Sequence, residues 1–108
     1  HHKLIAYQLA LALVTLVART RIADAQLRQQ ARKSAVSAAL NTAEGAARQT
    51  LADKSRMYAI ALAECCECCE CCAAVEIAGA LGACAQPQVH AIVELGTRLK
   101  NVLSRLVR

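Results

Sequence analysis

The sequence predicts an all-α protein, an antiparallel up-down-up-down bundle of four helices. Hydrophobic residues make up 56% of the 108-residue chain, and many of them are Ala or Leu, which favour helix. Pro occurs once and Gly four times, so the turn formers that an all-β fold needs are scarce. Helical apolar periodicity recurs in segments with short connections, which pack most simply as a bundle. The length suits one domain over residues 1–108.

The first helix is expected over residues 3–20. Its apolar face comprises Ile5, Leu9, Ala12, Leu13 and Leu16, and because further leucines broaden it we expect burial on more than one side. Segment 4–18 is the membrane candidate, but it is shorter than the roughly 20 residues of a spanning helix. No small-residue cleavage pattern marks it as a signal peptide. We expect a core helix without membrane contact, and His1 and His2 resemble the remainder of a purification tag.

Local signals delimit the other three helices. Asp24 is a suitable N-cap for a second helix over 24–47, whose Ala and Ser residues permit close helix contact. Thr50 and Asp53 form a capping-box pattern that opens a third helix over 51–81. At 1.5 Å per residue that helix would be about 45 Å long, and its overhang is a candidate oligomer interface.

A break with Gly82 as helix terminator and Pro87 as helix starter precedes the fourth helix, expected over 87–107. The apolar residues of this last helix follow the i, i+3, i+4 pattern of a buried face. They are Val89, Ile92, Val93, Leu99, Val102, Leu103 and Leu106.

Residues 63–74 read AECCECCECCAA, so six of the seven cysteines alternate with glutamates in a three-residue repeat. Neighbouring cysteines on one helix lack disulfide geometry, which points to a reducing cytoplasm. On a helical wheel most of these cysteines share an arc with Tyr58, Ala61, Leu62 and Val75, Cys71 lies furthest from it, and the glutamates lie opposite. We therefore interpret the cysteines as small apolar core residues.

Two chemical alternatives remain for the cysteine helix. Cys65, Cys68, Cys69 and Cys72 have the i, i+3 and i, i+4 spacing that lets thiolates share Cu(I) or Zn(II). Because His1, His2 and His90 lie outside the cluster, a closed site would need a second chain. A redox switch is disfavoured, since the flanking glutamates raise thiol pKa values. Cys84, in the connection, is expected to be inert, and we expect no cofactor.

The net charge of +5 is segregated along the chain. Basic residues dominate 19–56 and 98–108, whereas 57–94 contains acids and no Lys or Arg. This pattern is typical of a protein that presents a basic face to a polyanion, and a merely solvated face is the simpler alternative. With almost no aromatic residues, binding would rest on phosphate contacts. The candidates are Arg28, Arg32, Lys33, Arg48, Lys54 and Arg56.

No enzyme signature is recognisable in the sequence. It lacks a nucleophile–base–orienter pattern, a Gly-rich phosphate loop and the Glu-x-x-His of diiron bundles. Glu64, Glu67 and Glu70 are interpreted as a solvated face. We expect a non-enzymatic protein that binds nucleic acid, or else a scaffold oligomer that recruits a protein partner.

The stretch SAVSAALNTAEGAAR, residues 34–48, resembles the signature of the four-helix bundle proteins encoded by intervening sequences of bacterial large-subunit ribosomal RNA genes. Segments 6–14, 58–64 and 75–82 resemble the first helix and the two halves of the third helix of that family. One Glu-Cys-Cys triplet exceeds the family's spacing, and Ala stands where the family has Pro. The matching motif residues are Ser37, Asn41, Ala43, Glu44, Gly45 and Arg48.

The resemblance implies a bacterial protein that assembles into a homo-oligomeric ring, often a pentamer. It also implies similarity to the accessory variability proteins of diversity-generating retroelements, which bind nucleic acid and act with a reverse transcriptase. The partners implied are RNA or DNA, and a reverse transcriptase or another protein.

The motif residues themselves favour structural roles. Glu44 and Arg48 are spaced for an ion pair within one helix. Gly45 either admits a close neighbouring helix or ends the second helix, and Asn41 is placed to hydrogen-bond a neighbouring helix end. We favour turn and packing roles over ligand contact for this set.

Overall fold

A computed structural model describes the backbone of residues 1–80 and 86–108 and the side chains of 1–74 and 88–108. Its elements are α1 (His2–Arg19), α2 (Ala25–Ala47), α3 (Leu51–Ala80) and α4 (Gln86–Val107). Over these described ranges the regular structure is entirely helical, so the prediction of an all-helical chain with four helices is confirmed. Each boundary agrees with the prediction to within one residue. The predicted break at Gly82, Cys84, and the side chains of Val75 and Pro87 lie outside the described residues.

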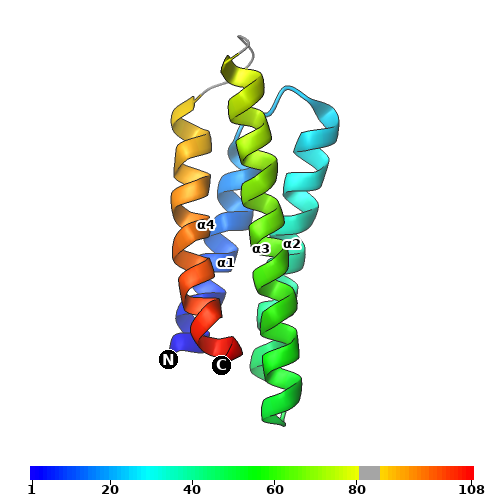
Figure 1. Ribbon diagram of the computed structural model, residues 1–108, viewed down its shortest axis with the longest axis vertical. Helices are drawn as coiled ribbons and strands as arrows, with labels where there is room; N and C mark the ends of the chain where they lie inside the picture. Colours follow the sequence, from blue (N-terminus) through cyan, green and yellow to red (C-terminus); the bar gives the residue numbers. More distant parts are fainter. Residues whose placement is uncertain (81–85) are drawn as a thin grey trace.

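The four helices lie alongside one another in a molecule that measures 48 × 21 × 19 Å, with the α1–α2 connection at one end and the α2–α3 turn at the other (Figure 1). The contacting pairs are α1–α2, α2–α3, α3–α4 and α1–α4. Both ends of the chain lie at the end that also holds the α2–α3 turn (Figure 1). We call this end the terminal end and the opposite one, with the α1–α2 connection, the distal end.

Side-chain caps fix the starts of α2 and α3, as the sequence predicts. The Asp24 carboxylate accepts a hydrogen bond of 2.9 Å from the Leu27 N–H. The Thr50 hydroxyl accepts one of 3.1 Å from the Asp53 N–H. Each cap satisfies a backbone donor that the first helical turn cannot pair internally.

The buried face of α1 agrees with the predicted one in part: Leu13 is buried, and Leu9 and Leu16 pack partly buried against the core. The buried face consists of Ala6, Ala10, Leu13 and Val17, whereas Ile5 is 38% exposed and Ala12 is exposed. Because Ala6 and Ala10 are small, the first half of α1 can lie close to its neighbours, whereas Leu4 and Leu11 lie outside the contact. Within a single copy of the chain, the expectation that the broad apolar surface of α1 is buried on more than one side is wrong, because Leu4 and Leu11 are exposed. α1 is long and apolar enough to cross a membrane by length and composition alone. Core helices of soluble proteins meet the same criterion.

The cysteine row of α3 is buried. Cys65, Cys68 and Cys72 have no exposed surface, Cys69 and Cys71 are nearly covered, and Cys66 is half-buried. Glu67 and Glu70 are exposed and Glu64 is half-buried, so the repeat is amphipathic, as the helical wheel predicts. Cys71, which lies furthest from the predicted arc, is also buried, because α3 packs against both α2 and α4 and its covered arc is wider than one neighbour would make it.

The buried face of α4 agrees with its predicted spacing. Val89, Ile92, Leu99 and Leu103 are buried in the core cluster, and the other predicted apolar residues pack against it. Gly96 of α4 faces the cysteine row. A Cβ added there would overlap the Cys69 sulfur, and the Cys65 thiol donates a hydrogen bond of 3.4 Å to the Gly96 carbonyl. The absence of a side chain at Gly96 therefore permits the close α3–α4 contact.

Candidate nucleic-acid interface

Three of the predicted phosphate-binding residues lie on the first half of α2, at the distal end. Arg28 donates a hydrogen bond of 2.8 Å to the Ile22 carbonyl, and Arg32 donates one of 3.3 Å to the Ala18 carbonyl. These guanidinium groups satisfy carbonyls at and beyond the end of α1, so they also hold the α1–α2 connection. Lys33 is exposed beside them.

The other three predicted residues surround the α2–α3 turn at the terminal end. Arg48 forms the predicted ion pair with Glu44, at 3.3 Å. Arg56 lies 3.9 Å from the Asp53 carboxylate. The Lys54 amine donates to the carbonyls of Ala46 and Gly45, at 3.2 and 3.4 Å, and so caps the last turn of α2.

The structure does not bring these six residues together on one face. Arg28 and Arg48 are separated by most of α2, which at 1.5 Å per residue amounts to about 30 Å. A single polyanion reaches both groups only by lying along the length of α2. Most of the six also serve the fold, because their charged groups bond to backbone carbonyls or to neighbouring carboxylates.

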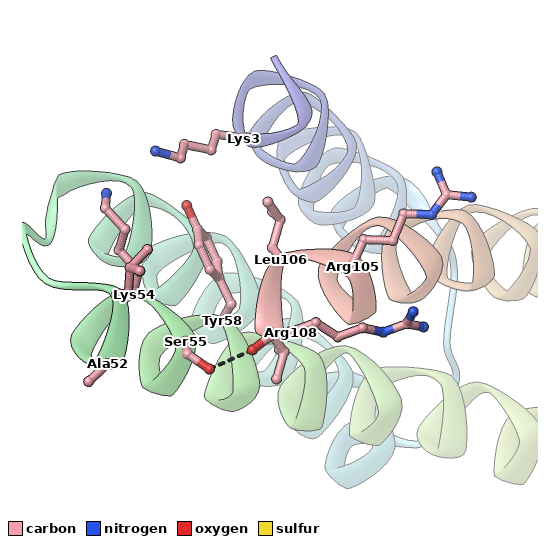
Figure 2. Close-up of a pocket in the computed structure, with 10 residues that line it drawn as sticks. Lys3, Ala52, Lys54, Ser55, Tyr58, Arg105, Leu106 and Arg108 are labelled. Carbon is pink, nitrogen blue, oxygen red and sulfur yellow. Dashed lines mark hydrogen bonds between the residues drawn. The ribbon is translucent and has the colours of Figure 1, made fainter.

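The terminal end gathers further basic residues that the sequence reasoning missed. Lys3, Arg105 and Arg108 line an open cavity of about 590 Å³ together with Lys54 (Figure 2). The Ser55 hydroxyl donates a hydrogen bond of 2.6 Å to the Val107 carbonyl and so ties α3 to the end of α4. The sequence contains the information needed to predict this cluster, namely basic residues at both ends of the chain and beside the connection between the second and third helices. In a four-helix up-down bundle, the start of the first helix and the end of the fourth meet beside the second connection.

The cavity also receives the side chain of Tyr58. The ring is 1% exposed, and its hydroxyl oxygen has no hydrogen-bond partner among the described residues. Burial raises the pKa of Tyr58. Partial loss of hydration, together with the charge of Lys3, lowers the pKa of Lys54. Two ammonium groups and a buried phenol therefore line one cavity.

The motif residues of α2 act in packing. Gly45 lies inside α2 and is buried, and a Cβ added there would lie 2.6 Å from Cε1 of Tyr58. Of the two predicted roles for Gly45, close approach of another helix is the one that the structure shows. Asn41 donates hydrogen bonds to the carbonyl and the hydroxyl of Ser37, at 2.9 and 3.2 Å. The prediction that Asn41 bonds a neighbouring helix end is therefore wrong, because Ser37 is one turn earlier on its own helix.

Ala43 and Leu40 belong to an apolar groove between α1 and α2, of about 210 Å³, which Tyr7, Leu11 and Val36 also line. Leu40 is 62% exposed and Leu4, close by on α1, is 58% exposed. We call this surface the α1–α2 apolar face. It is the part of the described surface on which large apolar side chains are most clearly left uncovered.

No disulfide links the described cysteines of α3, and the Cys65 thiol donates a hydrogen bond to the Gly96 carbonyl. Hydrogen bonding to Cys69 and burial raise the pKa of Cys65, and hydrogen bonding to Cys72 and burial raise that of Cys68. Among the residues that the structure describes, no three His, Cys, Asp or Glu side chains are placed to hold one metal ion. A closed soft-metal site at Cys65, Cys68, Cys69 and Cys72 would therefore need ligands from a second chain, as the sequence analysis expects.

Cys69 departs from the expectation that the flanking glutamates raise the thiol pKa values. The Cys65 thiol, which can turn its single proton from the Gly96 carbonyl to an ionised Cys69, and the charge of Lys100 on α4 lower the pKa of Cys69 to about 7, against the opposing effects of burial and Glu70. Cys71 follows the expectation, since burial and Glu67 raise its pKa. The difference arises first from Cys65, one turn earlier on α3, and to a smaller extent from Lys100 of α4, whose position a single helix cannot reveal.

A comparison with protein families matches residues 2–105 to the 23S rRNA-intervening sequence proteins. No curated protein resembles the chain closely enough to count as a match. The family match covers all four helices and agrees with the motif in α2 and with the all-helical fold. The chain therefore belongs to the 23S rRNA-intervening sequence protein family.

Proposed function

We propose that this chain is a non-enzymatic, antiparallel helical bundle that assembles into a homo-oligomeric ring and binds RNA through basic side chains at its terminal end. In this proposal it serves as an accessory to an RNA or reverse-transcription process. The family's link to 23S rRNA genes supports RNA over DNA as the first ligand to test.

The convergence of basic residues at the terminal end carries the proposal. Lys3 comes from α1, Lys54 and Arg56 from α3, and Arg105 from α4. The carboxylates described at this end, Glu44 and Asp53, are already next to Arg48 and Arg56. Such a local excess of positive charge attracts a phosphate backbone and does so without reading base sequence.

Binding to a short single-stranded RNA, measured by fluorescence anisotropy across salt concentrations, tests this function. The double variant Arg56→Gln/Arg105→Gln removes two exposed guanidinium groups from the terminal end. If both contact phosphates, the slope of log K against log salt should become shallower by about 1.4. Arg98→Gln removes one exposed charge from the middle of α4 and is the control. Absence of binding at low salt, or an unchanged slope in the double variant, would refute the proposal.

The α1–α2 apolar face supports self-assembly. Contiguous exposed apolar surface is unusual on a monomeric soluble domain and commonly marks an interface. A second copy of this chain is the occupant that we propose, because the face combines two helices that every copy presents. In this proposal the interface lies on α1 and α2 rather than on the overhang of the third helix, which the sequence analysis offered as a candidate.

Native mass spectrometry tests the assembly, with Leu40→Glu as the perturbation. Leu40 is largely exposed in one chain, so its replacement should leave the fold intact while placing a charge in the interface. Leu51→Glu makes the same exchange at an 85% exposed position at the start of α3 and is the control. A stable ring that binds no RNA would favour the scaffold alternative, in which the oligomer recruits a protein such as a reverse transcriptase.

A further inference from the structure

The hydroxyl of Tyr58 is an unexplained buried polar group. The residue is 1% exposed, and its oxygen has no hydrogen-bond partner among the described residues. Buried polar atoms are nearly always paired, because an unpaired one forfeits its bonds to water. Phe at this position would fill the same space without that cost. The hydroxyl is therefore a group for which the fold itself provides no use.

The hydroxyl points into the terminal cavity, towards the space that the amines of Lys3 and Lys54 also approach (Figure 2). These two ammonium groups interact unfavourably with each other. The described lining of the cavity contains four basic residues and no acid that would offset them. Lys54 gives hydrogen bonds to two carbonyls of α2, which fixes its position but neutralises no charge.

We propose that this cavity binds a phosphate group, held by the amines of Lys3 and Lys54 and by the hydroxyl of Tyr58. A phosphate supplies several strong acceptors, so it would take the unused phenol proton and bond both ammonium groups at once. Its negative charge would also offset the repulsion between the two lysines. The guanidinium groups of Arg105 and Arg108 point away from this space and would add to the local field only (Figure 2).

The size of the cavity indicates the class of ligand. At about 590 Å³ and open to solvent, it has room for the remainder of a molecule that carries the phosphate. The three donors would all bond the phosphate group, so the site would recognise the phosphate and would not distinguish between bases. The site thus extends the RNA proposal, but inorganic phosphate tests it without RNA.

Thermal unfolding in phosphate, compared with chloride at equal ionic strength, is the first test. In the wild type we expect a saturable rise of about 6 °C in Tm at roughly ten times Kd. Tyr58→Phe keeps the ring and removes the unpaired hydroxyl, so in chloride it should be at least as stable as the wild type. In phosphate it should lose most of the saturable rise, and Lys3→Gln should do the same.

Phosphate also stabilises proteins without binding to a specific site, so a control variant is needed to separate this general effect from binding in the cavity. Arg98→Gln removes one exposed charge outside the cavity and should keep the full saturable rise. If Tyr58→Phe and Lys3→Gln respond to phosphate as Arg98→Gln does, the site does not exist. A rise that is linear in phosphate and equal in all four proteins overturns the proposal in the same way.

A pair of RNA oligonucleotides of one sequence, with a 5′-phosphate or a 5′-hydroxyl, distinguishes the source of the phosphate. A preference for the 5′-phosphate that Tyr58→Phe abolishes assigns a terminal phosphate. Equal weakening of both RNAs by Tyr58→Phe assigns an internal phosphodiester. If the wild type binds inorganic phosphate but neither RNA, the RNA proposal fails and the phosphate site stands.

Discussion

Replacement of Gly45 by Ala sets two effects against each other at the α2–α3 contact. In an exposed helix interior this exchange stabilises by about 1 kcal/mol. In this chain the new Cβ would lie 2.6 Å from Cε1 and 2.8 Å from Cδ1 of Tyr58. Carbon atoms in contact are about 3.5–4.0 Å apart, so the ring must move by roughly 1 Å. Because the ring is 1% exposed, this displacement has to disturb the core atoms packed around it or move α3.

Overpacking of a closed contact costs about 1–3 kcal/mol, and two ring atoms inside the contact limit place this case near the upper value. After the helix-propensity gain, Gly45→Ala should destabilise the fold by about 1–2 kcal/mol. Urea unfolding at fixed chain concentration measures this, and Tm should fall by about 4–8 °C per kcal/mol. A variant as stable as the wild type, or more stable, would refute the close contact.

Two backgrounds identify the ring as the cause. Tyr58→Phe keeps Cε1 and Cδ1, so Gly45→Ala should cost the same there as in the wild type. Tyr58→Leu removes the edge of the ring, and in that background Gly45→Ala should become neutral or stabilising by up to about 1 kcal/mol. The same cost in the Leu background would show that the penalty comes from elsewhere.

Three further predictions concern a helix cap and the thiols. Asp24→Ala removes the acceptor of the 2.9 Å bond from the Leu27 N–H and should cost about 1 kcal/mol in urea unfolding, whereas Asp24→Asn should keep most of that stability. The pKa of Cys68 is raised in the folded state, so above about pH 8.5 the thiol ionises in the unfolded chain but stays protonated in the folded one, and the free energy of unfolding should fall by about 2 kcal/mol by about pH 10. In Cys68→Ala the loss of stability between these two pH values should be smaller by about that amount. The lowered pKa of Cys69, about 7, predicts that the difference in ultraviolet thiolate absorbance between the wild type and Cys69→Ala has a midpoint near that pH. Lys100→Gln should raise the midpoint, and a wild-type midpoint near 8.5 would contradict the assignment.

The sequence predicted helix boundaries well because local groups determine them. Asp24 and Thr50 each accept a backbone N–H of the helix that follows, so a cap can be recognised without knowledge of the rest of the fold. The amphipathic repeat of α3 is likewise local. The bare composition of that repeat suggests metal chemistry, but its spacing already places most of its sulfurs on the covered side of the helix.

The errors in the core concern the width and centre of a buried face. A wheel for one helix gives the mean direction of burial but not the number of neighbours. Cys71 is covered because α3 has a neighbour on each side. Ala6 and Ala10 occupy the centre of the α1 contact, where large side chains would hold the helices apart. A prediction that assigns the most hydrophobic residues to the buried face selects Ile5 instead.

The basic residues show a different limit. Residues close in sequence need not share a face, and Arg28 and Arg48 lie at opposite ends of one helix. Residues far apart in sequence can meet, as Lys3 and Arg105 do at the terminal cavity. Charge segregation along the chain therefore predicted a polyanion partner but could not say which cations act together.

Tyr58 connects the family motif to the candidate phosphate site. Gly45 of the motif leaves the space that the ring occupies, and the position of the ring directs the hydroxyl to the cavity that Lys3 and Lys54 line (Figure 2). A side chain at Gly45 that displaces the ring by roughly 1 Å would move the hydroxyl with it. Packing and phosphate binding are thus coupled through one residue. This coupling gives the motif glycine a reason to be present even though it touches no ligand itself.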